Sequence, residues 1–286
     1  MPFRAVLIAC LLLLSACTSL PERPAAGRNG VGRVGYWVQL NDSPMHSHAS
    51  GGMAGDYNRP YPHISWALTD YVNKALASRF AATTRFQLFD LKAEGYRLED
   101  LRGLVTLQEN QFTVADGKRA LLARLRQQHA LDFVVLIHPF AAGATSFCTP
   151  MGYCTSLNGI GTGLFTKSEM FGYAYKAVLG AQFDIYSLEP AATLSAYSPT
   201  TTPNLMFPIN SFAKPASWKN ITEQEWAPVK REVLAAADDL VNRVVNSLLG
   251  IDASCPYQAP QDGAKFSYGP RTGCVAQART RPSQSE

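Results

Sequence analysis

Apolar residues recur at helical spacing in three stretches of the chain, and each stretch predicts an amphipathic helix. The first helix is expected over residues 64–81. The second is expected from Asp116, whose carboxylate can cap the first turn, to about His129. The apolar stripes of these two helices, which would face the protein core, are formed by Leu68, Val72, Leu76 and Phe80 and by Leu121, Leu122 and Leu125.

The third helix is expected from Pro228 to Leu249, and Gly250 directly after it is typical of a helix C-terminus. Residues 222–225, Thr-Glu-Gln-Glu, have the order of a capping box. Because proline fits poorly inside a helix, we expect Pro228 to separate that capped turn from the main helix. The buried stripe of the main helix is formed by Val229, Val233, Ala236, Leu240, Val244 and Leu248.

Strand patterns lie between the helical stretches. Residues 32–40, 85–91 and 132–139 are rich in β-branched and aromatic side chains, and the last is almost wholly apolar. Alternation over residues 173–185 predicts one long half-buried strand, and residues 193–198 would return beside it as a β-hairpin. This order of elements predicts an α/β sandwich, in which a mixed sheet with a long β-hairpin is covered by about three helices.

We expect residues 32–250 to form a single α/β domain with three long loops. The loops, residues 41–63, 140–168 and 199–221, are crowded with turn-forming residues such as Gly, Pro, Asn and Ser. Connections of this length are uncommon in a compact domain unless they are functional or mobile. The loops are therefore the first places to look for a functional surface.

The N-terminus carries an export pattern. Arg4 is followed by an apolar run, residues 5–14, which has the length of a signal-peptide core and is too short to span a bilayer. Small residues then precede Cys17, an order that resembles the lipobox of bacterial lipoproteins. The resemblance implies a signal peptide over residues 1–16, acyl chains such as palmitate on Cys17, and a flexible tether over residues 17–31. An ordinary secretory signal with a chance cysteine is the alternative.

Composition narrows the classes of partner. The chain carries 26 Lys and Arg against 22 Asp and Glu, and loss of residues 1–16 would leave a formal charge of +3 because only Arg4 departs. A charge excess this mild, without a basic run, argues against nucleic acid as a partner. No later stretch is apolar enough to cross a membrane as a helix, so attachment would rest on the lipid anchor.

Six cysteines are present, of which Cys10 would leave with the signal peptide and Cys17 would carry the lipid. The remaining four are an even number in an exported chain, which predicts two disulfides and a stapled C-terminal tail over residues 251–286. A zinc site is the competing interpretation, but the spacings lack a CxxC knuckle. Of three connectivities, the local one is the simplest: Cys148–Cys154 and Cys255–Cys274.

Motifs that carry catalysis are scarce. The chain lacks the Gly-x-Ser-x-Gly and His-Glu-x-x-His patterns, and His138, at the end of an apolar strand, is expected to be a hydrogen-bonded core residue. One tract, Met45–His48 with Met53 nearby, contains side chains that could bind a metal ion, since imidazole and thioether groups together suit copper. We favour the alternative, a polar loop with incidental His and Met, and expect no metal or cofactor. The weak metal candidates are Met45, His46, His48 and Met53.

Short motifs resemble the small α/β domain of several envelope lipoproteins. Leu-Ala-Ser-Arg-Phe at residues 76–80 precedes a strand, and Leu-Asp-Phe-Val-Val at residues 131–135 begins another. Together with residues 173–198 and the last helix, these motifs resemble the group that includes the curli secretion lipoprotein, the Pel polysaccharide lipoprotein and the amino-terminal domain of TolB. The family hairpin often reads Asp-x-x-Thr-Gly, and the chain lacks that glycine after Asp184, so its turn must differ.

The resemblance implies an outer-membrane lipoprotein that faces the periplasm, and Thr18 after the lipidated cysteine is consistent with that sorting. Such a protein would be non-enzymatic. It would act as an assembly or export component of a cell-envelope complex through contacts with other envelope proteins, including copies of itself in a homo-oligomer. A regulatory or substrate-binding lipoprotein that docks on an envelope enzyme or transporter is the alternative. A hydrolase with a scattered triad and a copper-binding lipoprotein are less favoured.

Residues 141–171 are the expected contact segment, because a connection this long exceeds what the core needs. A disulfide in it would pre-organise the loop tip and reduce the entropy lost on binding. Loops build the oligomer in the curli-type relatives, which supports this expectation by analogy. The alternative is that the apolar residues fold back and cap one end of the sheet. The residues expected to be partly exposed are Leu164, Phe165, Met170 and Phe171.

Replacement of Cys17 by Ser tests the anchor. Because the thiol is the lipid acceptor, Cys17→Ser should leave an uncleaved or soluble precursor. The measurement is detergent partitioning together with the apparent size on a gel. A variant that partitions into detergent at the mature size would refute the lipobox interpretation.

Overall fold

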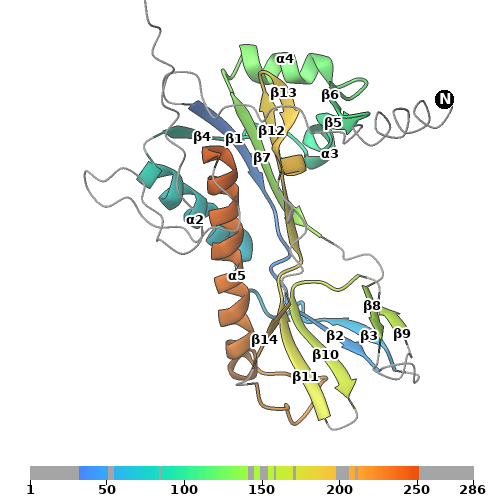
Figure 1. Cartoon of the computed structure of the whole chain (residues 1–286). Coiled ribbons are helices and arrows are strands. Elements are labelled where there is room, and N and C mark those ends of the chain that lie inside the picture. Colours follow the sequence, from blue (N-terminus) through green and yellow to red (C-terminus); the bar gives the residue numbers. More distant parts are fainter. Residues whose placement is uncertain are drawn as a thin grey trace, which may run out of the picture.

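Two five-stranded sheets, two small hairpins and four α-helices make up the part of the chain that the structure describes (Figure 1). The structure is a computed structural model. It describes residues 32–50, 55–83, 85–140, 145–148, 154–157, 159–169, 172–197, 206–209 and 212–250.

The first sheet is mixed, as the sequence predicts. Strand β1 runs parallel to both β4 and β7, and β12 lies antiparallel to β7 and to β13. The strand order is β13-β12-β7-β1-β4. The strands are β1 (Gly32–Val38), β4 (Phe86–Asp90), β7 (Phe133–Pro139), β12 (Ala181–Leu188) and β13 (Ala191–Thr193).

Helices cover both faces of the first sheet. Along β7, Phe133, Val135 and Ile137 join the core under α2 and α5, here called the α5 core. Val134 and Leu136 join a second core under α3, α4 and the β5–β6 hairpin, here called the α4 core. Burial on both faces explains the continuous apolar run of this strand. The covering elements are α2 (Leu68–Thr83), α3 (Leu98–Leu101), β5 (Val105–Gln108), β6 (Gln111–Val114), α4 (Arg119–Gln127) and α5 (Glu223–Leu249).

The strand predicted over residues 173–185 is two strands in different sheets. Its alternation is correct, because Ala177 and Phe183 on either side of the break belong to the same α5 core. At the break, the Gly180 N–H donates to Thr162 Oγ1 at 2.9 Å. A Cβ at Gly180 would lie 3.0 Å from the Thr162 nitrogen, so the close approach of the two backbones favours glycine.

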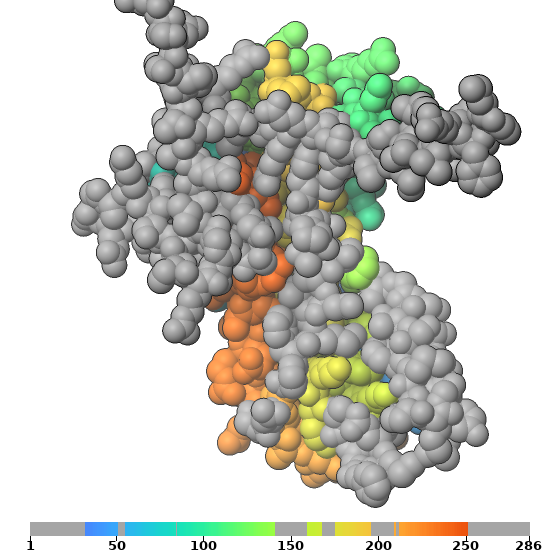
Figure 2. Space-filling view, viewed as in Figure 1, coloured from blue at the N-terminus to red at the C-terminus, as the bar shows by residue number. Residues whose placement is uncertain are grey.

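The second sheet corrects the expectation of three long loops, since each of those segments contributes strands to it. Its order is β14-β11-β10-β2-β3, and α5 contacts its strands β10 and β11 as well as β12 of the first sheet. Figure 2 shows parts of β10 and β11, in yellow-green, beside the start of α5, in orange, at the lower end of the molecule. The strands are β2 (Met45–Ala49), β3 (Tyr57–Pro60), β10 (Gly163–Glu169), β11 (Gly172–Val178) and β14 (Met206–Pro208).

Two predictions about helix ends differ from the structure. Asp116 does not cap α4, which begins after Lys118 without a side-chain cap. Pro228 does not divide the last helix, which runs unbroken from its capping box to Gly250. Pro228 lies in the second turn of α5, where the N–H that it lacks is the one that would bond to the Gln224 carbonyl. The capping box is confirmed, since Thr222 and Glu225 exchange hydrogen bonds of 2.8 and 3.3 Å.

The hairpin formed by β8 (Thr145–Cys148) and β9 (Cys154–Leu157) bears on the first proposed disulfide. Cys148 and Cys154 face each other in its antiparallel register. Facing residues have Cα atoms about 4.5–5.5 Å apart, within the range a disulfide needs. The pairing itself stays a prediction. Outside the described residues lie Cys17, Met53, Met170, Phe171, Cys255 and Cys274, together with the signal peptide 1–16, the tether 17–31 and the tail 251–286.

The expected exposure of Leu164 and Phe165 is wrong, because each side chain is only 1% exposed. They lie on opposite faces of β10. Leu164 belongs to the α5 core, and Phe165 packs in a small cluster with Ala49 and Val178. The physical reason is that this segment is a paired inner strand rather than a loop. None of the described helices has both the length and the apolar content to cross a bilayer.

Truncation of Leu164 should therefore destabilise the protein. We expect Leu164→Ala to lower the free energy of unfolding by about 2–5 kcal/mol, through lost burial and the cavity left behind. Lys167→Ala on the same strand, where the side chain is half-buried, is the matched control and should change it by less than about 0.5 kcal/mol. Urea unfolding measures both. An unchanged free energy in Leu164→Ala would contradict the burial of this strand.

Candidate functional site

One face of the second sheet carries aromatic and polar side chains in two rows. Paired residues on neighbouring strands point to the same face, and Leu164 shows that this is the face towards α5. Apolar residues occupy the α5 end of one row, whereas polar residues lie towards the edge strand β3. The rows are Tyr175, Thr166, His48 and Tyr57, and Ala177, Leu164, His46 and Arg59.

The Thr166 hydroxyl joins the two histidines. Its Oγ1 lies 2.8 Å from His46 Nε2 and 2.8 Å from His48 Nδ1. Because a hydroxyl has one hydrogen, it can donate to only one of these nitrogens, so at least one of the two rings donates an N–H to it. The second nitrogen of His46 lies 3.3 Å from the Tyr57 hydroxyl. Both nitrogens of the fully buried His46 are therefore engaged within the sheet.

Burial keeps this network neutral. Burial, together with smaller effects of the nearby His48 and Arg59, lowers the pKa of His46 to about 3. Burial also lowers the pKa of His48, against the opposite effect of Asp56. Desolvation disfavours the charged imidazolium, so both rings act as neutral hydrogen-bonding groups at neutral pH.

Trp218 covers His46 from the connection that precedes α5. Its ring lies 4.4 Å from the His46 ring, centroid to centroid, and is stacked on Phe212. The Trp218 carbonyl accepts hydrogen bonds from Arg59 Nη1, at 3.0 Å, and from the Tyr61 hydroxyl. These contacts hold the indole in one orientation on the sheet.

Four side chains on this face, here called the aromatic surface, are half-buried and so reach solvent. The Arg59 guanidinium lies 5.1 Å from the centre of the Tyr57 ring, within the range of a cation–π contact. Tyr, Trp and Arg are the residue types most often found in the energetic centres of protein interfaces. The aromatic surface consists of Tyr57, Arg59, Tyr175 and Trp218.

The structure separates the weak metal candidates. His46 and His48 lie on one face of β2, with the Thr166 hydroxyl between them. Met45 lies on the other face, where its sulfur is 3.2 Å from the position of a Cβ at Gly161. Neighbouring residues of a strand point to opposite faces, so Met45 cannot join a ligand set with the histidines. The described residues contain no group of three or more His, Cys, Asp or Glu arranged to hold a metal ion.

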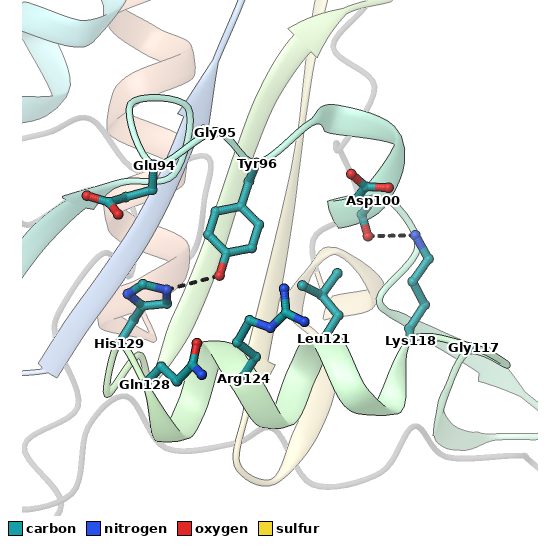
Figure 3. A pocket seen from close by; sticks show the side chains of 10 residues that line it. All are labelled: Glu94, Gly95, Tyr96, Asp100, Gly117, Lys118, Leu121, Arg124, Gln128 and His129. Atoms are coloured by element: carbon teal, nitrogen blue, oxygen red, sulfur yellow. Dashed lines mark hydrogen bonds between the residues drawn. The ribbon is translucent and has the colours of Figure 1, made fainter.

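A cleft of about 690 Å³ lies beside α4, on the far side of the first sheet from α5 (Figure 3). Sequence reasoning missed it, because its two walls are separate segments of the chain, residues 94–100 and 117–129, and neither contains a motif. A basic helix with no acidic residue was the only available signal. The cleft is lined by Glu94, Gly95, Tyr96, Asp100, Gly117, Lys118, Leu121, Arg124, Gln128 and His129.

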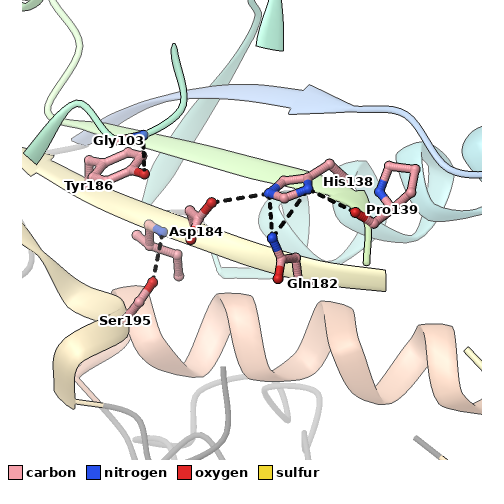
Figure 4. Close-up of polar contacts among 8 residues, drawn as sticks. Gly103, His138, Pro139, Gln182, Asp184, Tyr186 and Ser195 are labelled. Atoms are coloured by element: carbon pink, nitrogen blue, oxygen red, sulfur yellow. Dashed lines mark hydrogen bonds and ion pairs between the residues drawn. The ribbon is translucent and has the colours of Figure 1, made fainter. Parts of the chain in front are cut away.

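His138 is a hydrogen-bonded core residue, as predicted (Figure 4). It is 1% exposed, and its Nε2 lies 3.1 Å from Asp184 Oδ2 and 3.1 Å from the Gln182 amide nitrogen. Its Nδ1 lies 3.1 Å from the carbonyl oxygen of Pro139. Ser195 bonds instead to the backbone N–H of Ile185. The pair His138–Asp184 thus has no hydroxyl nucleophile bonded to it among the described residues.

Comparison with known proteins adds no family to this picture. No protein-family model matches the chain, and no curated protein matches it. The likeness to the envelope lipoproteins therefore stays a prediction based on short motifs.

The buried histidine predicts a pH dependence of stability. Folded His46 stays neutral down to about pH 3, whereas in the unfolded chain it titrates near pH 6.5. Between these pH values the unfolded chain binds more protons than the folded protein. The contribution of His46 to stability is therefore complete above about pH 6.5 and is lost as the pH falls. We expect the urea midpoint of the wild type to fall between about pH 6.5 and 4.5 more steeply than that of His46→Gln.

His63→Gln is the control for this experiment, because it removes a histidine that is exposed. Its pH dependence should match that of the wild type. Equal slopes in the wild type and His46→Gln would show that this network does not oppose protonation.

Proposed function

We propose that the protein is a non-enzymatic outer-membrane lipoprotein that faces the periplasm and serves as an assembly or export component of a cell-envelope complex. Cys17 would carry its lipid anchor. The observation that carries the proposal is the aromatic surface on the second sheet. The predicted leader and the motif resemblance support the location and the class of protein.

The second sheet is not needed to cover either face of the first sheet. Both faces of the first sheet are already covered by helices and by the β5–β6 hairpin. The chain nevertheless leaves the first sheet after β1, β7 and η1 (Leu194–Tyr197) to build strands β2, β3, β10, β11 and β14. A second sheet built from three such excursions, away from the α4 end of the molecule, fits a contact module (Figure 1).

The aromatic surface suits protein contacts for two physical reasons. Large rigid side chains bury much area and lose little conformational entropy on binding. The contacts of Trp218 with His46 and Arg59 already fix its orientation before any partner arrives. The expected partner is another envelope protein, and a second copy of the chain is included in that class.

Replacement of Tyr57 by Ser tests the aromatic surface. The full-length lipidated protein would be cross-linked in the envelope and purified as a complex. We expect Tyr57→Ser to abolish the complex, because a half-exposed aromatic contact is lost. The variant also loses the hydroxyl that bonds to His46, so its melting temperature should fall by no more than that of the matched control, which loses a hydroxyl hydrogen bond of the same kind.

Tyr71→Ser is the matched control. Tyr71 is equally half-buried but lies on α2, where its hydroxyl donates to Asp238 at 2.8 Å. It should retain the complex. Retention of the complex by Tyr57→Ser would overturn the proposed surface. A stable one-to-one complex with an envelope enzyme or transporter would favour the regulatory alternative.

A further inference from the structure

The cleft beside α4 is independent of the aromatic surface and lies at the other end of the molecule (Figures 1 and 3). One wall is the turn after β4 together with α3, and the other is α4 with the residues that flank it. Tyr96 is fixed at both ends, since its carbonyl accepts from Trp37 Nε1 at 3.1 Å and its hydroxyl lies 3.0 Å from His129 Nε2. A cleft with such fixed walls is formed before any ligand enters.

The positive charge of the cleft is only partly used by the protein. Helix α4 contains three arginines and no carboxylate. Arg126 is paired with Glu189, and the Lys118 ammonium donates to the carbonyls of Glu99 and Asp100 at 2.8 and 2.6 Å. Arg124 lines the cleft and is exposed, and its guanidinium makes no hydrogen bond or ion pair with any described residue.

The acidic residues of the cleft do not neutralise Arg124. Asp100 accepts two hydrogen bonds from Arg97, at 3.0 and 3.1 Å, and these bonds lower the pKa of its carboxyl group. Glu94 lies at the His129 end of the cleft and extends away from Arg124 (Figure 3). An unpaired guanidinium therefore faces the middle of a polar cleft.

We propose that this cleft binds a small hydrophilic ligand that carries an oxyanion, either a carboxylate or a phosphate, and that Arg124 holds the oxyanion. The planar guanidinium presents paired N–H donors that match two oxygens of such a group. The volume of about 690 Å³ is that of a small-molecule site. Side chains such as Gln128 and Lys118 leave donors for hydroxyl groups of the same ligand.

Calorimetric titration of the full-length protein in detergent tests the proposal with three probes of similar size. Glucuronate carries a carboxylate, glucose 6-phosphate carries a phosphate, and glucose carries neither. We expect saturable binding of at least one anionic probe, binding of glucose at least about tenfold weaker, and a loss of about tenfold or more in Arg124→Gln. The preferred anionic probe identifies which oxyanion the cleft takes.

Arg119→Gln is the matched control, because it removes the same charge from the same helix outside the cleft lining. It should change the affinity by less than about twofold. If Arg119→Gln and Arg124→Gln lose the same affinity for the anionic probe, the binding reflects general charge attraction, and the proposed site is wrong. Absence of saturable binding of both anionic probes up to about 20 mM would also overturn it. Neither outcome bears on the envelope complex tested with Tyr57→Ser.

Discussion

The burial of one long helix against two sheets is the constraint on which the architecture depends. Helix α5 has 27 residues, which at 1.5 Å per residue is about 40 Å. Its apolar stripe faces β12 of the first sheet and β10 and β11 of the second. At its start, Trp226 packs edge-to-face on Tyr61 and Trp66, which follow β3. Removal of the second sheet would therefore expose apolar surface on the same helix that completes the first.

Local patterns predicted the elements that depend on local contacts. The stripe from Val229 to Leu248 and the apolar run of β7 could be recognised from sequence, because helical spacing and burial on both faces leave direct signatures. Apart from the alternation of β11, the second sheet left no such signature. Strands β2, β3 and β14 have only three to five residues, and pairing in this sheet joins residues as distant as His46 and Thr166, which are 120 positions apart. Long-range pairing of this kind overrides the turn propensity of the Gly- and Asn-rich segments around it.

The aromatic surface was not predicted from the sequence, which pointed only to the neighbouring histidines, and to those as weak metal candidates. Sequence composition identified the Met45–His48 tract as unusual, and the structure explains the tract as alternating faces of one strand beside the Thr166 hydroxyl. Arg124 could not be found in this way. An exposed arginine on a helix is ordinary until the opposite wall of the cleft, which comes from a different part of the chain, is in place.

The passage of the chain through Gly180 has a mechanical consequence. Strands β11 and β12 are almost continuous, so a pull on the second sheet is carried along the covalent backbone into the first. There β12 is bonded to β7 over seven residue pairs, and tension along its axis would load those hydrogen bonds together rather than one at a time. Such shear loading is the stiff direction of a sheet. The two ends of the molecule are thus rigidly connected through β11 and β12, and a force that a partner applies to the second sheet would be transmitted to the first sheet.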